Sequence, residues 1–318
     1  MSTPEWQSVL TTHEDGDGSN RVNEYHMMET LGKGTFAKVK LFERRVENSE
    51  PRRFAAKIMS KSALSKMKEY VRVGESMSAV TALDKVEAEI NIMRTLYHRN
   101  VVLLFEVIND PSSDKIYLIL EYLPKGPCML YDADTKVFKS PITGTTLPEE
   151  LAKKHIRDIV QGVKYLHNRG ICHRDIKPDN ILLNDDNRCH LSDFGCAQVL
   201  EPSARLTSTV GTYQFLAPEC CSGEPFNPFR VDIWAIGVTL YIFLYGVLPF
   251  DAPNTKQLFD DILVKSIEYP STTTSISVLG MDFLQSALCK DPSERPTIAN
   301  MELHPWLAPE DNDGPISF

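Results

Sequence analysis

The sequence lacks several features that define whole classes of proteins. Its 318 residues include seven cysteines, an odd number, and no two of them have the C-x-x-C spacing. This pattern argues against a disulfide-stapled secreted domain and favours reduced thiols in a cytoplasmic or nuclear protein. The first residues, MSTPEWQSVL, also lack a basic segment followed by a long apolar one, so we expect no secretory signal.

Positive charge is scarce as well. The chain has 34 Lys and Arg against 43 Asp and Glu, which gives a formal net charge of −9. A net acidic chain does not bind nucleic acid or an anionic membrane through bulk charge, so we expect neither partner. With 42% hydrophobic and 24% charged residues, the composition is that of an ordinary globular protein, which excludes a disordered or collagen-like chain.

One apolar run allows two interpretations. Residues 233–250 carry no charge, and these 18 positions are just long enough to span a bilayer. The same run is compatible with a buried core helix that Asp232 caps and that Gly246 and Pro249 end. Length alone leaves both interpretations open.

The order of the expected elements indicates an α+β chain with two halves. Residues 1–21 are polar and predict a tail, residues 60–83 give no clear pattern, and residues 132–146 predict a surface excursion with a short hairpin. We expect strands at 39–42, 54–58, 103–108 and 116–122, and helices at 148–168, 230–245, 254–264 and 278–289. Another helix precedes the third strand, with an apolar face made of Val86, Ile90, Met93, Leu96 and Tyr97. A β-rich half before a helical half predicts a ligand-binding cleft between them.

Two motifs in the first half have the chemistry of phosphate binding. The first is the run Gly32, Lys33, Gly34, Thr35, Phe36, Ala37, Lys38 and Val39. Glycines between two strands let backbone amides approach phosphate oxygens, although such a pair often marks a plain hairpin turn. The second motif is Lys57 at the end of an apolar strand, with Glu89 on the following helix as its expected ion-pair partner. Taken alone, these two charges could equally be an ordinary surface pair.

Two further motifs in the second half are more specific. In the run HRDIKPDN, residues 173–180, Asp175 can accept or orient a hydroxyl proton, Lys177 can meet phosphoryl charge and Asn180 can reach a metal. Five matching positions at fixed spacing occur by chance in about one of ten thousand chains of this size. Thirteen residues after Asn180, Asp193 is followed by Phe194 and Gly195, and a carboxylate at a loop start suits a hard cation.

These four motifs in this order resemble a eukaryotic protein kinase, and the resemblance covers about residues 22–306. It implies the bilobal kinase fold, with a small β-rich N-lobe at 22–123, a larger mainly helical C-lobe at 124–306 and a C-terminal tail at 307–318. The apolar run 233–250 then becomes the buried central helix of the C-lobe, which removes the membrane span. Lys177 and the Gly211-Thr212 pair are of the serine/threonine type.

The resemblance also implies cofactors, ATP and Mg²⁺, and a role for each site residue. Asp175, Lys177, Lys57 and Glu89 would be catalytic, and Asn180 and Asp193 would hold the metal. The residues expected around ATP are Leu31, Gly32, Lys33, Gly34, Thr35, Phe36, Ala37, Lys38, Val39, Ala55, Lys57, Glu121, Leu123 and Leu182. Ala37 replaces the third glycine that the family carries, and we expect a stiffer phosphate loop without loss of ATP.

Two more family features concern the activation segment. Ala217-Pro218-Glu219 would close it, with Arg295 as the ion-pair partner of Glu219. Arg174 could pair with a phosphate on this segment, and Ser208 and Thr209 are the expected regulatory sites. A serine- and threonine-containing loop that is never modified is the alternative.

Within the family, the chain resembles the calcium/calmodulin-dependent protein kinase kinases. Gly126-Pro127 after the hinge and the run Ser60-Lys61-Ser62-Ala63-Leu64 carry this resemblance. It implies a protein substrate, the activation loop of a downstream kinase such as an AMP-activated type. No basic amphipathic helix follows Trp306, so direct calmodulin binding is not expected. The alternatives are another calmodulin-kinase-like serine/threonine kinase and a catalytically silent scaffold with a kinase fold.

Overall fold

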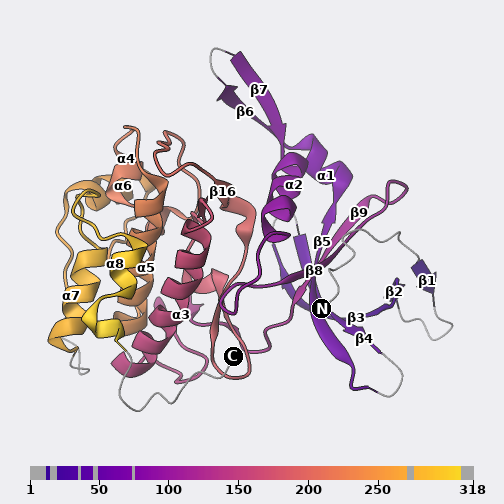
Figure 1. Cartoon of the computed structure of the whole chain (residues 1–318), viewed down its shortest axis with the longest axis horizontal. Coiled ribbons are helices and arrows are strands. Elements are labelled where there is room, and N and C mark those ends of the chain that lie inside the picture. The colour runs from indigo at the N-terminus through magenta and orange to yellow at the C-terminus, as the bar shows by residue number, and fades with distance from the viewer. Residues whose placement is uncertain are drawn as a thin grey trace. The chain divides into compact units, whose positions relative to one another are not determined.

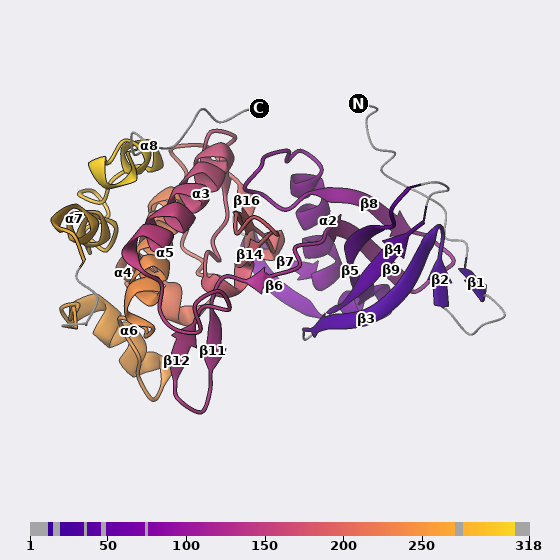
Figure 2. The ribbon, with the colours of Figure 1, turned by 90° about the horizontal axis from the view of Figure 1, so that it is seen from below.

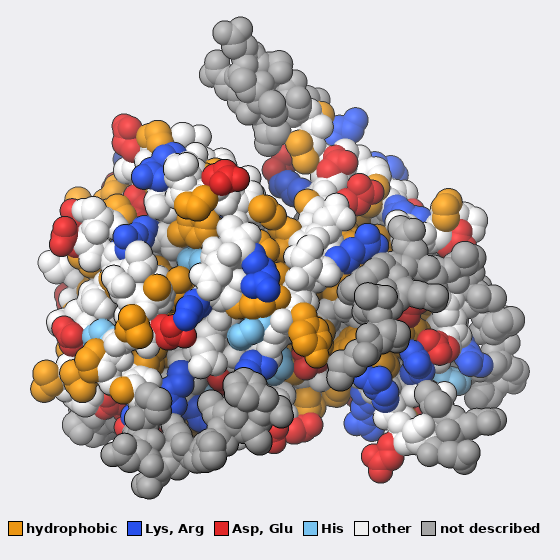
Figure 3. Space-filling view, viewed as in Figure 1, with side chains coloured by type: hydrophobic (Ala, Val, Ile, Leu, Met, Phe, Trp, Pro, Cys, Tyr) orange, Lys and Arg blue, Asp and Glu red, His pale blue; other side chains and the backbone are white. Residues whose placement is uncertain are grey.

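The computed structural model describes residues 12–14, 20–34, 37–45, 49–73, 76–270 and 276–308, with the backbone alone at 12–14, 20, 70–73 and 76–78. The chain forms two compact units, shown in Figures 1 and 2. The N-terminal unit combines Met1–His98 with Val102–Pro124, and the C-terminal unit combines Arg99–Val101 with Lys125–Phe318. On the face seen in Figure 3, positive and negative side chains are interspersed, in keeping with a chain that has no bulk basic charge.

A seven-stranded antiparallel sheet forms most of the N-terminal unit. Its strand order is β1 (Thr12–Glu14), β2 (Asn20–Val22), β3 (Tyr25–Lys33), β4 (Ala37–Arg44), β5 (Arg52–Ser60), β9 (Lys115–Glu121) and β8 (Leu104–Asn109). The four strands expected from the sequence are all present, as β4, β5, β8 and β9. The expected polar tail contains two strands, because the turn at Asn23 lets β2 pair with β3 and extend the edge of the sheet.

Strand register separates the two faces of this sheet. Val39 lies opposite Lys57, and Lys57 lies opposite Leu118, so these side chains share one face with Ala55, two residues before Lys57. The other face carries the buried cluster of the unit, which is made of Val22, Tyr25, Phe42, Phe54, Ala56, Ile108, Tyr117 and Ile119. A slip of one residue would bury Lys57 in that cluster, so the cluster fixes the register.

The segment after β5, which showed no clear pattern in the sequence analysis, contains three elements. They are α1 (Lys61–Lys66), β6 (Lys68–Val73) and β7 (Ser76–Thr81), and in the described part of the chain β6 and β7 pair only with each other. The next helix, α2 (Ala82–Met93), starts at a capping box in which Thr81 and Asp84 exchange hydrogen bonds. Its expected buried face is confirmed except at Tyr97, which is exposed because the helix ends at Met93.

Helices dominate the C-terminal unit. They are α3 (Glu149–His167), α4 (Pro218–Cys221), α5 (Pro228–Tyr245), α6 (Thr255–Val264), α7 (Val278–Ala287) and α8 (Ile298–Glu302). The four expected helices are confirmed as α3, α5, α6 and α7. Among the described residues, α5 alone is long and apolar enough to cross a membrane, and 89% of its apolar window is buried inside the unit. The run 233–250 therefore contributes a core helix.

Three small sheets complete this unit. They are β10 (Gly126–Pro127) with β14 (Ile181–Leu183) and β15 (Cys189–Leu191), β11 (Leu130–Asp132) with β12 (Val137–Lys139), and β13 (Ile171–Cys172) with β16 (Gln198–Val199). The short hairpin expected within residues 132–146 is present as β11 and β12, although it begins earlier, at Leu130; the two strands run side by side in Figure 2. Short 3₁₀ turns lie at Pro178–Asn180, Phe194–Cys196, Tyr213–Phe215 and Pro305–Leu307.

Candidate functional site

An ion pair joins β5 to α2 in the N-terminal unit. The Lys57 ammonium lies 2.7 Å from a Glu89 carboxylate oxygen, as the sequence predicted. The Lys57 side chain is 19% exposed and that of Glu89 is 5% exposed, so the pair is sheltered from water on the carboxylate side. Burial of Ile90 and Met93 on α2 fixes the helix that carries Glu89, which orients the lysine. A lysine held in this way can present its remaining donors to phosphate oxygens.

The glycine motif forms the connection between β3 and β4. Gly32 lies opposite Val39, and the Gly34 amide donates to the Ala37 carbonyl at 2.8 Å. A Cβ atom at Gly32 would meet nothing within 4 Å, so the backbone there is open to an approaching ligand. Thr35 and Phe36, two of the residues expected around ATP, lie outside the described residues.

Four donors fix the Asp175 carboxylate in the C-terminal unit. Its Oδ1 accepts from the backbone N–H and the hydroxyl of Thr212, at 3.0 and 2.8 Å. Its Oδ2 accepts from the Lys177 ammonium at 2.8 Å and from the Asn180 amide at 2.9 Å. A carboxylate held by four donors is fixed in orientation, as a group that positions a hydroxyl must be.

The sequence identified Asp175, Lys177 and Asn180 but did not predict the role of Thr212. Its hydroxyl bonds both Asp175 and Lys177, at 2.8 and 2.7 Å. The Gly211-Thr212 pair could have indicated this role, but the sequence analysis used it only as a mark of serine/threonine kinases. Gly211 has a φ of 97°, and a Cβ there would lie 2.5 Å from the Arg174 carbonyl, so the glycine lets Thr212 approach the catalytic loop.

Asn180 and Asp193 are brought together by the pairing of β14 with β15. Ile181 lies opposite Leu191, and Ser192 donates its amide and its hydroxyl to the Asn180 carbonyl, at 2.9 and 3.0 Å. Asp193, next in the chain, is exposed and has the left-handed φ of 57°. The Asp193 carboxylate and the Asn180 amide oxygen are ligands of the type that Mg²⁺ prefers, so the residues present fit a divalent cation.

Phe194 anchors the residue that precedes it. Its side chain is fully buried, and its ring centroid lies 5.1 Å from that of His173. His173 in turn lies two residues before Asp175. The contact therefore couples the position of Asp193 to that of the catalytic loop.

The buried carboxylate of Asp232, in α5, holds the backbone of the catalytic loop. Its carboxylate accepts from the backbone amides of His173 and Arg174, at 3.0 and 2.8 Å, and contacts the His167 ring at 2.8 Å. Burial acts to raise the pKa of Asp232, but the His167 hydrogen bond and charge hold it below its usual value. The expectation that Asp232 caps the apolar helix was wrong, because α5 starts at Pro228 and Asn227 is its cap. The sequence signal for its role in holding the catalytic loop was that Asp232 is the only acidic residue in this apolar helix.

Arg174 faces the activation segment. Its guanidinium donates to the Gln198 amide oxygen and, at 3.4 Å, to the Ser208 carbonyl. The Thr209 hydroxyl donates to the Cys220 carbonyl at 3.0 Å. Of the two candidate regulatory residues, Ser208 therefore contacts the Arg174 guanidinium through its backbone carbonyl, and such a guanidinium can also pair with phosphate.

The end of the activation segment is held by the expected ion pair. Two nitrogens of Arg295 lie 2.6 and 3.0 Å from the two carboxylate oxygens of Glu219. Arg295 is 1% exposed, and its guanidinium lies 5.2 Å from the centre of the Trp234 ring. A bidentate pair with one buried partner fixes direction as well as distance.

The other residues expected around ATP are divided between the units. Leu31, Val39, Ala55, Glu121 and Leu123 belong to the N-terminal unit. Leu182 belongs to the C-terminal unit, where it lies in β14 opposite Pro127. Gly126 before it has a φ of 65°, which explains why glycine precedes that proline.

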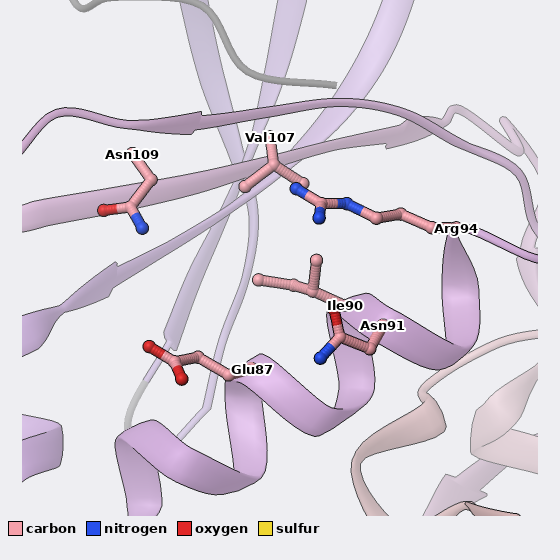
Figure 4. Close-up of a pocket in the computed structure, with 6 residues that line it drawn as sticks. All are labelled: Glu87, Ile90, Asn91, Arg94, Val107 and Asn109. Carbon is pink, nitrogen blue, oxygen red and sulfur yellow. The ribbon is translucent and has the colours of Figure 1, made fainter. Parts of the chain in front are cut away.

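A separate hollow of about 180 Å³ lies between α2 and β8 (Figure 4). Ile90 and Val107 approach each other across it, and Glu87, Asn91, Arg94 and Asn109 surround them. None of these residues was among the sequence predictions for the site. The hollow is distinct from the Lys57–Glu89 pair, although α2 contributes to both.

Comparisons with known proteins place the chain in a family. Residues 25–307 match the protein kinase domain family. Serine/threonine-protein kinase ssp1 of Schizosaccharomyces pombe is 37% identical over 300 residues, which cover 91% of this chain and 43% of ssp1. Serine/threonine-protein kinase GRIK1 of Arabidopsis thaliana is 36% identical over 309 residues, which cover 97% of this chain and 72% of GRIK1.

A third relative, serine/threonine-protein kinase TOS3 of Saccharomyces cerevisiae, is 34% identical over 309 residues, covering 90% of this chain and 53% of TOS3. The chain thus spans about half or less of two of these three relatives. The family match covers nearly the whole chain, and all three relatives are serine/threonine kinases. This chain belongs to the protein kinase family and is a protein serine/threonine kinase.

Proposed function

We propose that the chain is a catalytically active kinase that transfers the terminal phosphoryl group of Mg-ATP to a serine or threonine hydroxyl. The observation that carries this proposal is the fixed Asp175 carboxylate, with Lys177 and Asn180 on one oxygen and Thr212 on the other. Phosphoryl transfer needs placement and charge neutralisation more than covalent help, and this arrangement supplies placement.

Each charged group then has one task. Asp175 positions the substrate hydroxyl and receives its proton, and Lys177 meets the charge on the moving phosphoryl group. Lys57, oriented by Glu89, binds ATP phosphates together with the backbone of the glycine motif. Asn180 and Asp193 would hold Mg²⁺, whose charge neutralises phosphate oxygens when it is bound.

Val39 and Ala55 in the N-terminal unit, and Leu182 in the C-terminal unit, are assigned to adenine contacts. Backbone groups of Glu121 and Leu123 would hydrogen-bond to the polar edge of the adenine. A scaffold that had abandoned catalysis would not need this set of residues, and Lys57, Asp175, Asn180 and Asp193 are all present.

The subgroup proposal is a kinase of the calcium/calmodulin-dependent protein kinase kinase type. It is supported by the Gly126-Pro127 pair, which forms β10 against β14. Residues 60–83 lie where that group carries an insert, but they lack its Pro-, Arg- and Gly-rich composition. They contain α1 and the β6–β7 hairpin. A substrate in keeping with this subgroup is the activation-loop threonine of a downstream kinase.

The test compares Asp175→Asn with Asp186→Asn, a matched change at an exposed turn residue. The substrates are a serine/threonine peptide mixture and, in a second arm, a catalytically inactive downstream kinase whose modified residue is mapped by mass spectrometry. We expect Asp175→Asn to lower kcat at least a hundredfold, removal of Mg²⁺ to abolish transfer and Asp186→Asn to stay within twofold of wild type.

No phosphoryl transfer by wild type, with Asp175→Asn indistinguishable from it, would favour the scaffold. Transfer to peptides without modification of the activation loop would reject only the subgroup proposal.

A further inference from the structure

Three side chains that carry metal-binding atoms converge within the C-terminal unit, next to the catalytic loop. They are His167 at the end of α3, Cys172 in β13 and Asp232 in α5. A ring nitrogen, the thiol sulfur and a carboxylate oxygen of these residues all lie within 4.8 Å of one another. The function proposed above assigns no task to Cys172.

The separations of these atoms suit a single tetrahedral ion. Zinc binds sulfur at about 2.3 Å and nitrogen or oxygen at about 2.0 Å, so the ligand atoms around it lie roughly 3.3 to 3.6 Å apart. His167 Nε2 and Asp232 Oδ2 lie 2.8 Å apart and share a proton. An ion in place of that proton requires these two atoms to separate by about 0.5 Å, and the sulfur to approach them by at most about 1.2 Å.

Such an ion would leave the hydrogen bonds of the catalytic loop intact. Asp232 Oδ1 accepts the Arg174 amide, and Oδ2 accepts the His173 amide at 3.0 Å in addition to its contact with His167. The ion would take only the position of the proton between Oδ2 and the ring. Edge-on packing against Phe229, with ring centroids 5.0 Å apart, already orients His167. Two of the three ligands are therefore held in place before an ion binds.

Charge balance favours a divalent cation at this place. Burial and the neighbouring Asp232 carboxylate raise the pKa of the Cys172 thiol, so without an ion the thiol stays protonated. The two charges of a cation neutralise one carboxylate and one thiolate, which makes the buried group neutral overall. The thiol proton then leaves to solvent, and the neutral His167 ring keeps its proton on Nδ1. Thiolate and imidazole select zinc over Mg²⁺, which prefers oxygen ligands.

His167 is the ligand closest to solvent. Its side chain is 7% exposed, whereas those of Asp232 and Cys172 are fully buried, so a water molecule on this side can complete the tetrahedron. We propose that His167, Cys172 and Asp232 form a zinc-binding site that ties the end of α3 to β13 and α5 and stabilises the base of the catalytic loop. This inference goes beyond the proposed function and does not depend on it.

The test uses Co²⁺ as the probe, because a bond between cobalt and a thiolate adds a near-ultraviolet absorption that oxygen and nitrogen ligands do not give. The full chain is freed of metal with a chelator and titrated with Co²⁺ in excess Mg²⁺, which fills the site of Asn180 and Asp193. We expect one equivalent of Co²⁺ to bind with this absorption, and Zn²⁺ to displace it. Zn²⁺ at a hundredfold excess over its Kd should raise Tm by about 5 °C.

Three variants assign the binding to this group. Cys172→Ser should abolish both the cobalt–sulfur absorption and the Tm shift. Cys189→Ser, the same change at another buried cysteine, which is 1% exposed and lies in β15, should keep both. His167→Gln should lower the Co²⁺ affinity at least tenfold and keep the absorption at saturating Co²⁺.

Absence of the cobalt–sulfur absorption in wild type would overturn the inference. Absorption that survives Cys172→Ser, or that is lost equally in Cys189→Ser, would do the same, because the sulfur ligand would then lie elsewhere. If Cys172→Ser does not fold, an unchanged Co²⁺ affinity in His167→Gln decides against the site. None of these measurements reads kinase activity, so the proposed function is tested separately.

Discussion

At the scale of single residues, His155 shows how burial controls ionisation. It lies in α3, fully buried against Phe243, with ring centroids 6.0 Å apart. Among the described residues neither of its ring nitrogens has a hydrogen-bond partner. Burial lowers the pKa of His155 to about 4, with a smaller contribution from the charge of Lys154. The folded protein therefore keeps this ring neutral where the unfolded chain would protonate it.

The consequence is a loss of stability in acid. Above pH ~6.5 the ring is neutral in both states, and between pH ~6.5 and ~4 only the unfolded state gains the proton. We expect this histidine to lower the free energy of unfolding by about 3 kcal/mol across that range. Urea unfolding at pH 7.5 and pH 5 should show a smaller difference for His155→Leu than for wild type.

The partly exposed His26 provides a control, and His26→Gln should behave as wild type does. If His155→Leu retains the full acid sensitivity, other groups must carry it.

At the scale of elements, the β11–β12 hairpin depends on Gly246. This residue has a φ of 72°, and a Cβ there would lie 2.9 Å from the Thr146 methyl carbon and 3.2 Å from the Phe138 carbonyl oxygen. Gly144 has nearly the same φ, 71°, but a Cβ there would meet nothing within 4 Å. The two glycines separate the cost of backbone conformation from the cost of crowding.

We expect Gly144→Ala to lower the free energy of unfolding by about 1 kcal/mol, the cost of a left-handed backbone alone. Gly246→Ala should lower it by about 2 to 3 kcal/mol, because the methyl group also displaces the hairpin. Urea unfolding of both variants measures the difference. An equal loss of unfolding free energy in both variants would mean that moving the hairpin to accommodate the methyl group costs no free energy.

The activation segment is the second element with a testable property. Arg174 contacts Gln198 and the Ser208 carbonyl, so a phosphate on Ser208 or Thr209 would find a guanidinium nearby. We expect phosphatase treatment to lower the activity of wild type about tenfold. The double variant with alanine at both positions should be equally slow before treatment and insensitive to it.

Ser203→Ala, at an exposed serine of the same segment, is the control and should respond as wild type does. A double variant that is as active as wild type would show that neutral contacts alone order the segment.

At the scale of the whole molecule, the charged site was the part best predicted from sequence. The spacing of HRDIKPDN specifies one local loop, and Lys57 with Glu89 and Glu219 with Arg295 were each predicted as pairs and found at hydrogen-bond distance. Because each of these charged residues stands in or near a recognisable motif, few residues of opposite charge remain as its possible ion-pair partner.

Other features depended on contacts that no local pattern encodes. The β6–β7 hairpin pairs only with itself among the described strands, so no buried face imposed an alternating pattern on it. Thr212 and Asp232 bind the catalytic loop, which lies 37 to 59 residues away in sequence. The sequence around a single threonine or aspartate does not indicate which distant residue it will contact. Tyr97 followed the helical period, but the helix had already ended.

The bond between Arg295 and Glu219 has a mechanical consequence. Ser192 is bonded to Asn180 at one end of the activation segment, and Glu219 is clamped at the other. Between these ends the segment is also held where Gln198 and Val199 pair with β13 and where Thr212 bonds Asp175. The stretch between Val199 and Thr212 can therefore change its conformation without moving either end. Phosphorylation of Ser208 or Thr209 can therefore change the conformation of this stretch while Asp193 and Glu219 stay in place.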